Sequence, residues 1–482
     1  MSDLEKHESS RDEREEREGD GSLQGVGIPD PDAHLSPEEK DKIERQLLWR
    51  LDLVLIPWLC LLYLLAFLDR TNIGNAKVAG LLDDLHLTTG QYNAALSIFF
   101  VSYSLFEPLT NVLLKKLRPS IFIPTIMFFW GASMTGMGFC YNDSGLLAAR
   151  WFLGLTEAGL FPAIFFSAAA LAGSFGGLLA AAIEKLDGKG GLAGWRWIFI
   201  LEGLLTVVVA VASYWMVHDF PDDARFLTED DRARVIRRLR LDQQSSAEHE
   251  EWSIKYLYAG LRDWKMWLGM VIYMGCDMPL YAFSLFLPTI IQESGWSTSV
   301  IRTNLLSVPP YAAAAVLTVV IGFVADRTRQ RGLCNIIVSV IGIIGFILLI
   351  ASNDPAVKYA ATFLGALGIY PCISNTITWM ANNAEGVYKR GVVLGFVIGW
   401  GNLNGIVSSN IFFDSPRFLQ GHGVILAYMV LFLFGGSLLM TTLLRIENKK
   451  RREGKRDYLA EGKTEAELER MGDARPDFFY TT

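Results

Sequence analysis

The sequence has few of the residues that build metal, redox or nucleic-acid sites. Its 482 residues include five cysteines, none in a CxxC spacing, so we expect free, buried thiols. No metal-ligand cluster and no nucleophile–base arrangement stands out, so we expect no enzyme, no metal and no organic cofactor. Charged residues make up only 20%. No basic face with interleaved aromatic residues is present, so we expect no nucleic-acid partner.

Long apolar segments dominate instead. Hydrophobic residues make up 51% of the chain, and the mean hydropathy is +0.28. The segments are about 20 residues long, enough to cross about 30 Å of hydrocarbon as a helix. The sequence therefore predicts an all-α polytopic membrane protein. The expected spans are 51–75, 92–114, 120–140, 145–162, 163–183, 197–217, 265–291, 303–325, 333–352, 358–381, 391–413 and 424–445.

A charged stretch separates two groups of six spans. This arrangement is typical of transporters built from internal repeats. Ser36-Pro37-Glu38-Glu39 predicts a helix start, with an N-cap serine, proline at the first position and a capping-box glutamate. The predicted division is a disordered cytoplasmic tail (1–45), an N-terminal six-helix bundle (46–217), a cytoplasmic linker (218–263), a C-terminal six-helix bundle (264–446) and a cytoplasmic tail (447–482).

Lysine and arginine gather on one side of the expected spans. They follow spans two, six, eight and twelve and precede span eleven. By the positive-inside rule these connections are cytoplasmic, and so are both termini. We expect a multi-pass protein of the plasma membrane, a monomer surrounded by bilayer lipid.

Two pairs of ionisable residues interrupt the apolar spans: Asp69-Arg70 in span one, and Arg150 with Glu157 in span four. A charge at this depth costs roughly 2.5–3.5 kcal/mol and is tolerated mainly on an ion or substrate pathway. Arg150 and Glu157 are seven residues apart and share a helix face. Arginine can bind a carboxylate as a fork, and a desolvated carboxyl can carry a proton. The alternative is a structural ion pair that ties span one to span four.

One loop has a spacing associated with conformational gating. Gly322, Asp326, Arg327 and Arg331 fit the GxxxD(R/K)xxx(R/K) loop of the major facilitator superfamily, between spans eight and nine. Glycine would allow close helix approach, and the acidic and basic residues would pair across the cytoplasmic gate. The alternative is an ordinary basic loop.

Further motifs extend this resemblance over residues 48 to about 455. The chain resembles the fungal anion:cation symporter branch of that superfamily, which includes allantoate, nicotinate, pantothenate and biotin permeases. The resemblance implies the major facilitator fold. The matching stretches are Phe67-Leu-Asp69-Arg70-Thr-Asn72-Ile-Gly-Asn75, Phe106-Glu107-Pro108, Arg150-x3-Gly154-x2-Glu157, Gly194-Trp195-Arg196-Trp197, Phe220-Pro221-Asp222, Asn382-Asn383-x2-Gly386-x2-Lys389-Arg390 and Gly399-Trp-Gly401-Asn402.

The resemblance also implies site residues. Some of them have a structural alternative: Glu107 could hydrogen-bond the backbone group that Pro108 leaves unpaired in its helix, and Tyr281, Tyr370 and Trp379 could be packing residues. Small residues such as Gly173 and Gly177 on span five are expected to allow close helix contact. The expected substrate-binding residues are Arg70, Arg150, Asn72, Tyr281, Tyr370, Asn375 and Trp379, and the expected proton-coupling residues are Asp69, Glu157 and Glu107.

Spans four and five are abnormally short. Residues 145–183 are apolar without a polar connector and are broken only at Phe161-Pro162. Two crossings need about 40 residues before any turn. By the resemblance, relatives carry a block of about 20 more residues here, roughly one span's length. The two spans are therefore predicted to be fused or shortened.

Three functions follow. The first is proton-coupled uptake of a small organic anion, nicotinate or another vitamin-like carboxylate, with the proton gradient as the energy source. The second is an efflux antiporter of toxic metabolites, but the Gly-Pro-rich signature of such proteins is absent because no proline occurs between Ala163 and Ile183. The third is a non-transporting or inactive isoform, suggested by the shortened spans.

Overall fold

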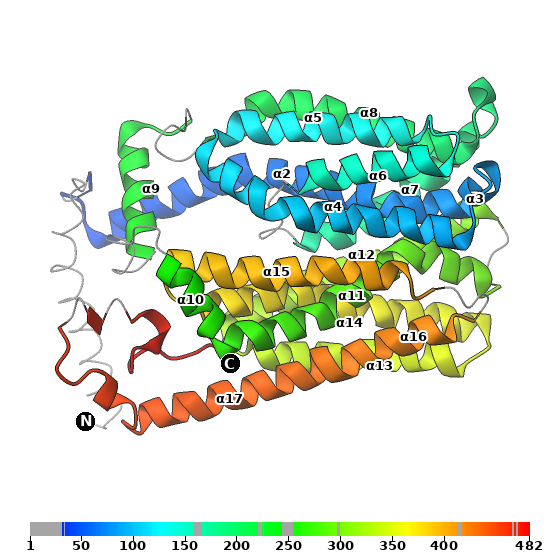
Figure 1. Cartoon of the computed structure of the whole chain (residues 1–482). Helices are drawn as coiled ribbons and strands as arrows, with labels where there is room; N and C mark the ends of the chain where they lie inside the picture. The colour runs from blue at the N-terminus through cyan, green and yellow to red at the C-terminus, as the bar shows by residue number, and fades with distance from the viewer. Residues whose placement is uncertain are drawn as a thin grey trace.

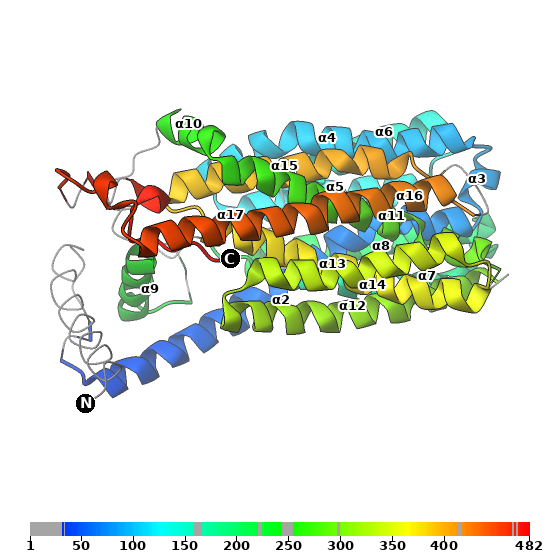
Figure 2. The same ribbon diagram turned by 90° about the horizontal axis from the view of Figure 1, so that it is seen from below.

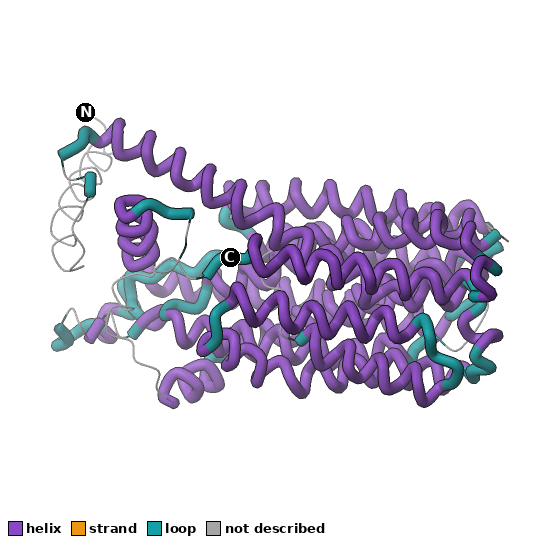
Figure 3. The backbone as a smooth tube through the Cα atoms, turned by 90° about the horizontal axis from the view of Figure 1, so that it is seen from above, coloured by secondary structure: helices purple, strands orange, loops and turns teal. Residues whose placement is uncertain are grey.

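The described part of the protein is a bundle of long helices. The computed structural model describes residues 31–482 except 33, 159–165, 220–223, 225, 243–253, 296–298, 413–416, 465–466 and 469–470. Within these residues there are helices and connections but no strand (Figure 3). Nine of the described helices are long and apolar enough to cross a membrane. The predicted all-α polytopic class is confirmed.

The first bundle opens with one long helix, α2, which begins where the capping box predicts. The Ser36 amide donates to Glu39 Oε2 over 3.0 Å, and the Glu39 amide donates to Ser36 Oγ over 3.4 Å. Residues 37–45, assigned above to a disordered tail, are therefore helical. The helices are α2 (Pro37–Val78), α3 (Leu81–Asp84), α4 (Thr89–Lys116), α5 (Pro119–Met137), α6 (Asp143–Glu157), α7 (Phe166–Ile183) and α8 (Gly194–Met216).

The linker and the second bundle follow. The last predicted span is a continuous rod in which the helix α16, the π-helical segment η6 and the helix α17 succeed one another. The elements are α9 (Glu229–Asp242), α10 (Ile254–Arg262), α11 (Trp264–Glu293), α12 (Val300–Thr328), α13 (Arg331–Ala351), α14 (Pro355–Asn382), α15 (Val387–Ser409), α16 (Leu419–Ala427), η6 (Tyr428–Phe434) and α17 (Gly435–Arg452).

The two bundles lie side by side as two layers (Figure 1). Contacts between them run through the helix pairs α2–α11, α4–α15 and α7–α12. The start of α2, the C-terminus, α9 and α10 lie at one end of the molecule, which we call the tail end; the opposite end is the far end (Figures 1 and 2). The predicted fold, two six-helix bundles, is confirmed.

The region predicted to be shortened is described only on either side of residues 159–165: α6 ends at Glu157, and α7 is described from Phe166. The predicted shortening stays a prediction. The predicted fusion at Phe161-Pro162 lies outside the described residues.

The C-terminal segment docks on the tail end of the second bundle. Asp473 pairs with Lys265 of α11 and with Lys389 of α15, each over 2.6 Å. The Trp379 indole donates to the Thr481 carbonyl over 2.8 Å. Burial opposes ionisation of Asp473, but the two ammonium groups outweigh it and hold the pKa of Asp473 below its usual value. The segment therefore ties together the ends of three second-bundle helices.

Candidate functional site

The site centres on a buried ion pair between α2 and α6. Arg70 donates to Glu157 Oε1 from Nε over 2.9 Å and from Nη2 over 2.5 Å. The side chains are 9% and 1% exposed, respectively. A buried pair of this kind is costly to break because either partner alone is an uncompensated charge. The pair joins span one to span four, as the alternative interpretation of these charges anticipated.

The same guanidinium also reaches the second bundle. Arg70 Nη1 donates to Tyr281 Oη over 2.6 Å, and that hydroxyl donates to Asn402 Oδ1 over 2.8 Å. The Asn402 amide returns to the first bundle by donating to Glu107 Oε2 over 3.2 Å. We call this series, Glu157–Arg70–Tyr281–Asn402–Glu107, the relay. It connects four of the helices at the bundle interface with α6.

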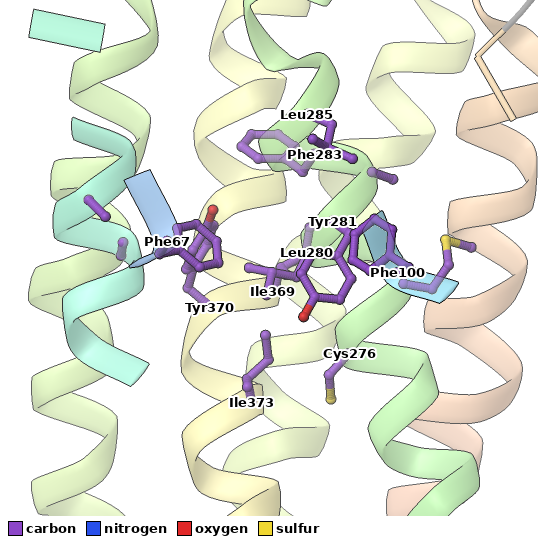
Figure 4. Packing of buried hydrophobic residues seen from close by; sticks show 14 of the residues in the cluster. Phe67, Phe100, Cys276, Leu280, Tyr281, Phe283, Leu285, Ile369, Tyr370 and Ile373 are labelled. Atoms are coloured by element: carbon purple, nitrogen blue, oxygen red, sulfur yellow. The ribbon is translucent and has the colours of Figure 1, made fainter. Parts of the chain in front are cut away.

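Aromatic rings surround the Arg70 guanidinium. Its carbon lies 5.3 Å from the Phe99 ring centre, 4.9 Å from that of Tyr103 and 5.4 Å from that of Tyr281. Tyr281 in turn packs against Phe100 of α4, as Figure 4 shows. Ring faces stabilise a cation and leave flat apolar surfaces beside it.

A second guanidinium, that of Arg150, lies beside the same group of rings with spare donors. Its carbon is 4.7 Å from the Phe99 ring centre, and its Nε donates to the Ala95 carbonyl over 3.3 Å. Arg150 is fully buried, yet within the described part of the chain its Nη1 and Nη2 have no hydrogen-bond partner, and neither does Glu157 Oε2. Buried polar groups are normally satisfied. A carboxylate anion beside Arg150 would supply acceptors for its two unsatisfied nitrogens, and also for an O–H on Glu157 if that carboxyl were protonated.

Asp69 and Asn72 point away from the relay, toward α8. Thr206 donates to Asp69 Oδ2 over 2.8 Å, and the Asn72 amide donates to the Glu202 carboxylate. These groups form a polar seam inside the first bundle. Their predicted roles in coupling and binding stay predictions, but the structure does not bring them to Arg70.

Tyr370 lies in the core of the second bundle. Its ring lies among the buried hydrophobic residues that Figure 4 shows. Its hydroxyl shares a hydrogen bond of 2.8 Å with Ser284, and its ring meets Tyr311 edge-on at 5.8 Å. Tyr370 has no described hydrogen bond to the relay, and these contacts are those of a packing residue. Its predicted substrate contact stays a prediction.

Asn375 and Trp379 lie nearer the tail end of α14. Asn375 donates to the Arg331 carbonyl over 2.7 Å and to Asn335 over 2.8 Å. Trp379 is bonded to the C-terminal segment, as described above. Both predicted substrate ligands are therefore committed to contacts within the protein, and the structure does not bring them to the relay.

The predicted gate loop joins α12 to α13. Asp326 pairs with Arg331, whose Nη1 also donates to Asn375 over 3.0 Å. This pair bridges helices of one bundle rather than the two bundles. Gly322 has nothing within 4 Å of where a Cβ would lie, so the expected close helix approach is not present here, and Arg327 is exposed. The loop is a helix-end anchor in this state.

The bundles are pressed together in the far half of the molecule. A Cβ at Gly177 of α7 would lie 2.5 Å from Ser307 Oγ and 2.6 Å from the Asn304 carbonyl of α12, and one at Gly173 would lie 2.8 Å from the Tyr311 ring. The close contact predicted for these glycines is confirmed. A cavity of about 710 Å³ lies between α4 and α15, in the half of the molecule nearer the tail end. It is lined by Glu107, Met270, Gly395 and Gly399 among others. The relay thus ends at the wall of this cavity.

Sequence reasoning missed two residues. Asp277, in the middle of α11, is 1% exposed and faces the same helices as the relay. An ionisable residue inside an apolar span was the signal used for Asp69 and Glu157, and it applied equally to Asp277. Asn402 belongs to one of the matching stretches, but its spacing alone gave no reason to place it between Tyr281 and Glu107.

Two helical bundles that enclose buried charges at their interface form the architecture of a membrane transporter. The family model described as the Major Facilitator Superfamily matches residues 59–409. The chain belongs to this superfamily, so its predicted resemblance is confirmed.

Relatives and solved structures agree with this assignment. The chain is similar to an uncharacterized transporter, C1002.16c, of Schizosaccharomyces pombe (37% identity, 81% of each chain). It is also similar to the high-affinity nicotinic acid transporter of Saccharomyces cerevisiae (29% identity, 92% of this chain and 86% of the relative). A bacterial homologue of the lysosomal transporter Spinster matches with a TM-score of 0.59 at 15% identity, covering 80% of this chain and 95% of the other, which shows the fold.

Proposed function

We propose that the protein takes up a small organic monocarboxylate, nicotinate or a similar flat acid, together with protons across the plasma membrane. The observation that carries this proposal is the unsatisfied Arg150 guanidinium next to the Arg70–Glu157 pair. A carboxylate is the ligand that fits a guanidinium fork. The similarity to a nicotinic acid transporter and the ring faces of Phe99 and Tyr103 beside Arg70 support a flat aromatic acid.

The coupling of substrate to proton follows from competition between Glu157 and the substrate carboxylate for Arg70. While Glu157 is ionised, it occupies two of the Arg70 donors. When Glu157 takes a proton, its hold on Arg70 weakens, and both arginines can bind the incoming carboxylate. Loss of that proton restores the ion pair and expels the anion. Substrate and proton therefore favour each other's binding, which is the linkage that symport requires.

The contacts described above support one state of an alternating-access cycle. If the tail end is cytoplasmic, the closed far half faces outward, and the α4–α15 cavity faces the cytoplasm. The side chains of Arg70 and Glu157 are nearly inaccessible in this state. The structure then corresponds to an inward-facing form in which the centre of the site is closed.

Uptake by proteoliposomes tests the proposal. Purified protein is reconstituted, and accumulation of labelled nicotinate is followed with an acidic exterior. We expect accumulation above equilibrium that a protonophore abolishes, and in Glu157→Gln we expect a weaker pH dependence of accumulation with exchange of external for internal nicotinate retained. Folded protein that moves none of a panel of monocarboxylates would contradict the proposal and favour the non-transporting alternative.

A further inference from the structure

Asp277 is the buried carboxyl of the second bundle that the relay leaves unused. It is 1% exposed, and neither of its oxygens has a hydrogen-bond partner among the residues that the structure describes. An isolated ionised carboxylate in such a place is costly enough that the group takes up a proton instead. In this state of the molecule Asp277 is therefore a neutral carboxylic acid.

Asp277 lies between the relay and the cavity. On α11, Tyr281 follows it by one turn and Met270 precedes it by two, so the three share one helix face. Tyr281 belongs to the relay, and Met270 lines the α4–α15 cavity. From α15, a Cβ at Gly401 would lie 3.1 Å from Asp277 Oδ2, so this glycine allows the carboxyl close to the backbone beside Asn402.

The titratable groups that face Asp277 come from three helices. Those that interact with its carboxyl electrostatically are Arg70 and Tyr63 of α2, Glu107 of α4, and Tyr273 and Tyr281 of α11 itself; the neighbouring Cys276 also interacts with it, although its thiol contacts Thr376. The one cation among them, Arg70, is held by Glu157 in this state. Among the described residues, Asp277 therefore has no free cation to pair with. Gly401, which lies against its carboxyl, directly follows Trp400, and Trp400 lines the cavity through which a released proton could leave.

We propose that Asp277 carries a second transported proton, in addition to the one on Glu157. The carboxyl is protonated while the site is closed. When the α4–α15 cavity admits water, the acid dissociates into carboxylate and a proton that leaves through the cavity. It is protonated again when the site opens to the far end. One monocarboxylate anion then moves with two protons, so each cycle carries one net positive charge. This inference rests on the proposed symport and adds its stoichiometry.

Voltage dependence in proteoliposomes tests the second proton. A potassium gradient with valinomycin sets an inside-negative potential, and nicotinate accumulation is measured with and without a pH gradient. One net charge corresponds to about a tenfold rise in accumulation for about 60 mV. We expect this rise in the wild type and in Asp277→Glu, but not in Asp277→Asn, which keeps the shape of the protonated acid. Asp277→Asn should still respond to the pH gradient through Glu157.

Cys276→Ala is the matched control, because Cys276 is the adjacent buried residue and faces Thr376 of α14. It should keep the full voltage response. A wild type that accumulates nicotinate with the pH gradient but ignores voltage would overturn the second proton alone, as would an Asp277→Asn variant with the full voltage response. A wild type without any proton-driven accumulation would instead overturn the proposed function.

Discussion

The two bundles bury their charges in different places. Among the described residues, the first bundle buries these ionisable side chains within its spans: Asp69, Arg70, Glu107, Arg150, Glu157 and Glu202. The second bundle holds Asp277 there, and its other buried charges gather at the tail end: Asp263, Lys265, Arg331, Glu385, Arg451 and Asp473. The duplicated architecture is thus symmetric in its helices and asymmetric in its chemistry.

This difference teaches that the bundles divide the work. Under the proposed function, the first bundle carries the arginines that would bind the anion and the carboxyl of Glu157 that would hold the first proton. The second bundle supplies the hydroxyl of Tyr281 and the amide of Asn402 to the interface, while its ion pairs fasten the C-terminal segment. Substitutions in the first bundle should therefore affect transport chemistry, and substitutions at the tail end of the second should affect stability.

Among substitutions that test this division of work, loss of Arg70 should have the largest effect on transport. Arg70→Ala leaves Glu157 buried without its partner, a change worth about 3–5 kcal/mol, and cuts the relay. We expect nicotinate uptake to fall by at least about 100-fold. Arg70→Lys keeps the charge but not the planar fork, and it should also fail to restore uptake. The matched control Arg445→Ala, at an exposed arginine of α17, should transport normally. Normal uptake by Arg70→Ala would contradict the assignment of the transport chemistry to the first bundle.

The second-largest effect on transport is expected when closure of the far half is blocked. Gly177→Leu places a side chain where Ser307 and Asn304 of the other bundle already lie, so the far half cannot close as described. We expect uptake to fall by about tenfold, a cost of about 1.4 kcal/mol, and a cysteine introduced at Ser307 to react faster with an external thiol reagent. Gly136→Leu, at a helical glycine with open space around it, is the control. Equal labelling in both variants would speak against contact-dependent closure.

The tail-end ion pairs should matter for stability rather than transport. Asp473→Asn leaves Lys265 and Lys389 with one anionic partner fewer, so we expect the Tm to fall by about 2–4 °C per kcal/mol lost with the affinity for nicotinate unchanged. Since the pKa of Asp473 is lowered in the folded protein, its stabilising contribution is complete above the unfolded value of about 3.9 and is lost as the pH falls through the folded value. Asp477→Asn, 75% exposed, is the control. A large loss of substrate affinity in Asp473→Asn would contradict the division of work.

The smallest effect is expected at Trp379. Trp379→Phe removes one hydrogen bond to the C-terminal segment, worth about 0.5–1.5 kcal/mol of stability. Because the indole is committed to Thr481, we expect the KM for nicotinate to change by less than about twofold. A tenfold rise in KM without a change in Tm would restore Trp379 as a substrate ligand.

Much of the fold could be predicted from the sequence because its signals are local. The apolar runs located the spans, the capping box located the start of α2, and the glycines of α7 indicated close contact with a neighbouring helix. The pairing of Arg70 with Glu157 could be suggested as well, since two unlike charges in adjacent spans have few other partners.

The rest depends on the direction of side chains across the bundle interface. Asp69 and Arg70 are neighbours in sequence, yet one turns to α8 and the other to α6, which helix packing alone decides. The position of Trp379 depends on a C-terminal segment about a hundred residues away along the chain, and that of Asn375 depends on Arg331 and Asn335 of another helix; no motif connected either residue to these partners. Asp277 was visible in the sequence, but its lack of a partner was not.

Direct binding of nicotinate to the purified protein tests the central claim most closely. Isothermal titration calorimetry would give the Kd for the wild type, Arg150→Gln and Glu157→Gln. If the two arginines hold the carboxylate and Glu157 competes for Arg70, Arg150→Gln should weaken binding by at least about tenfold, and Glu157→Gln should tighten it. Weaker binding in Glu157→Gln, with Arg150→Gln binding like the wild type, would contradict the account.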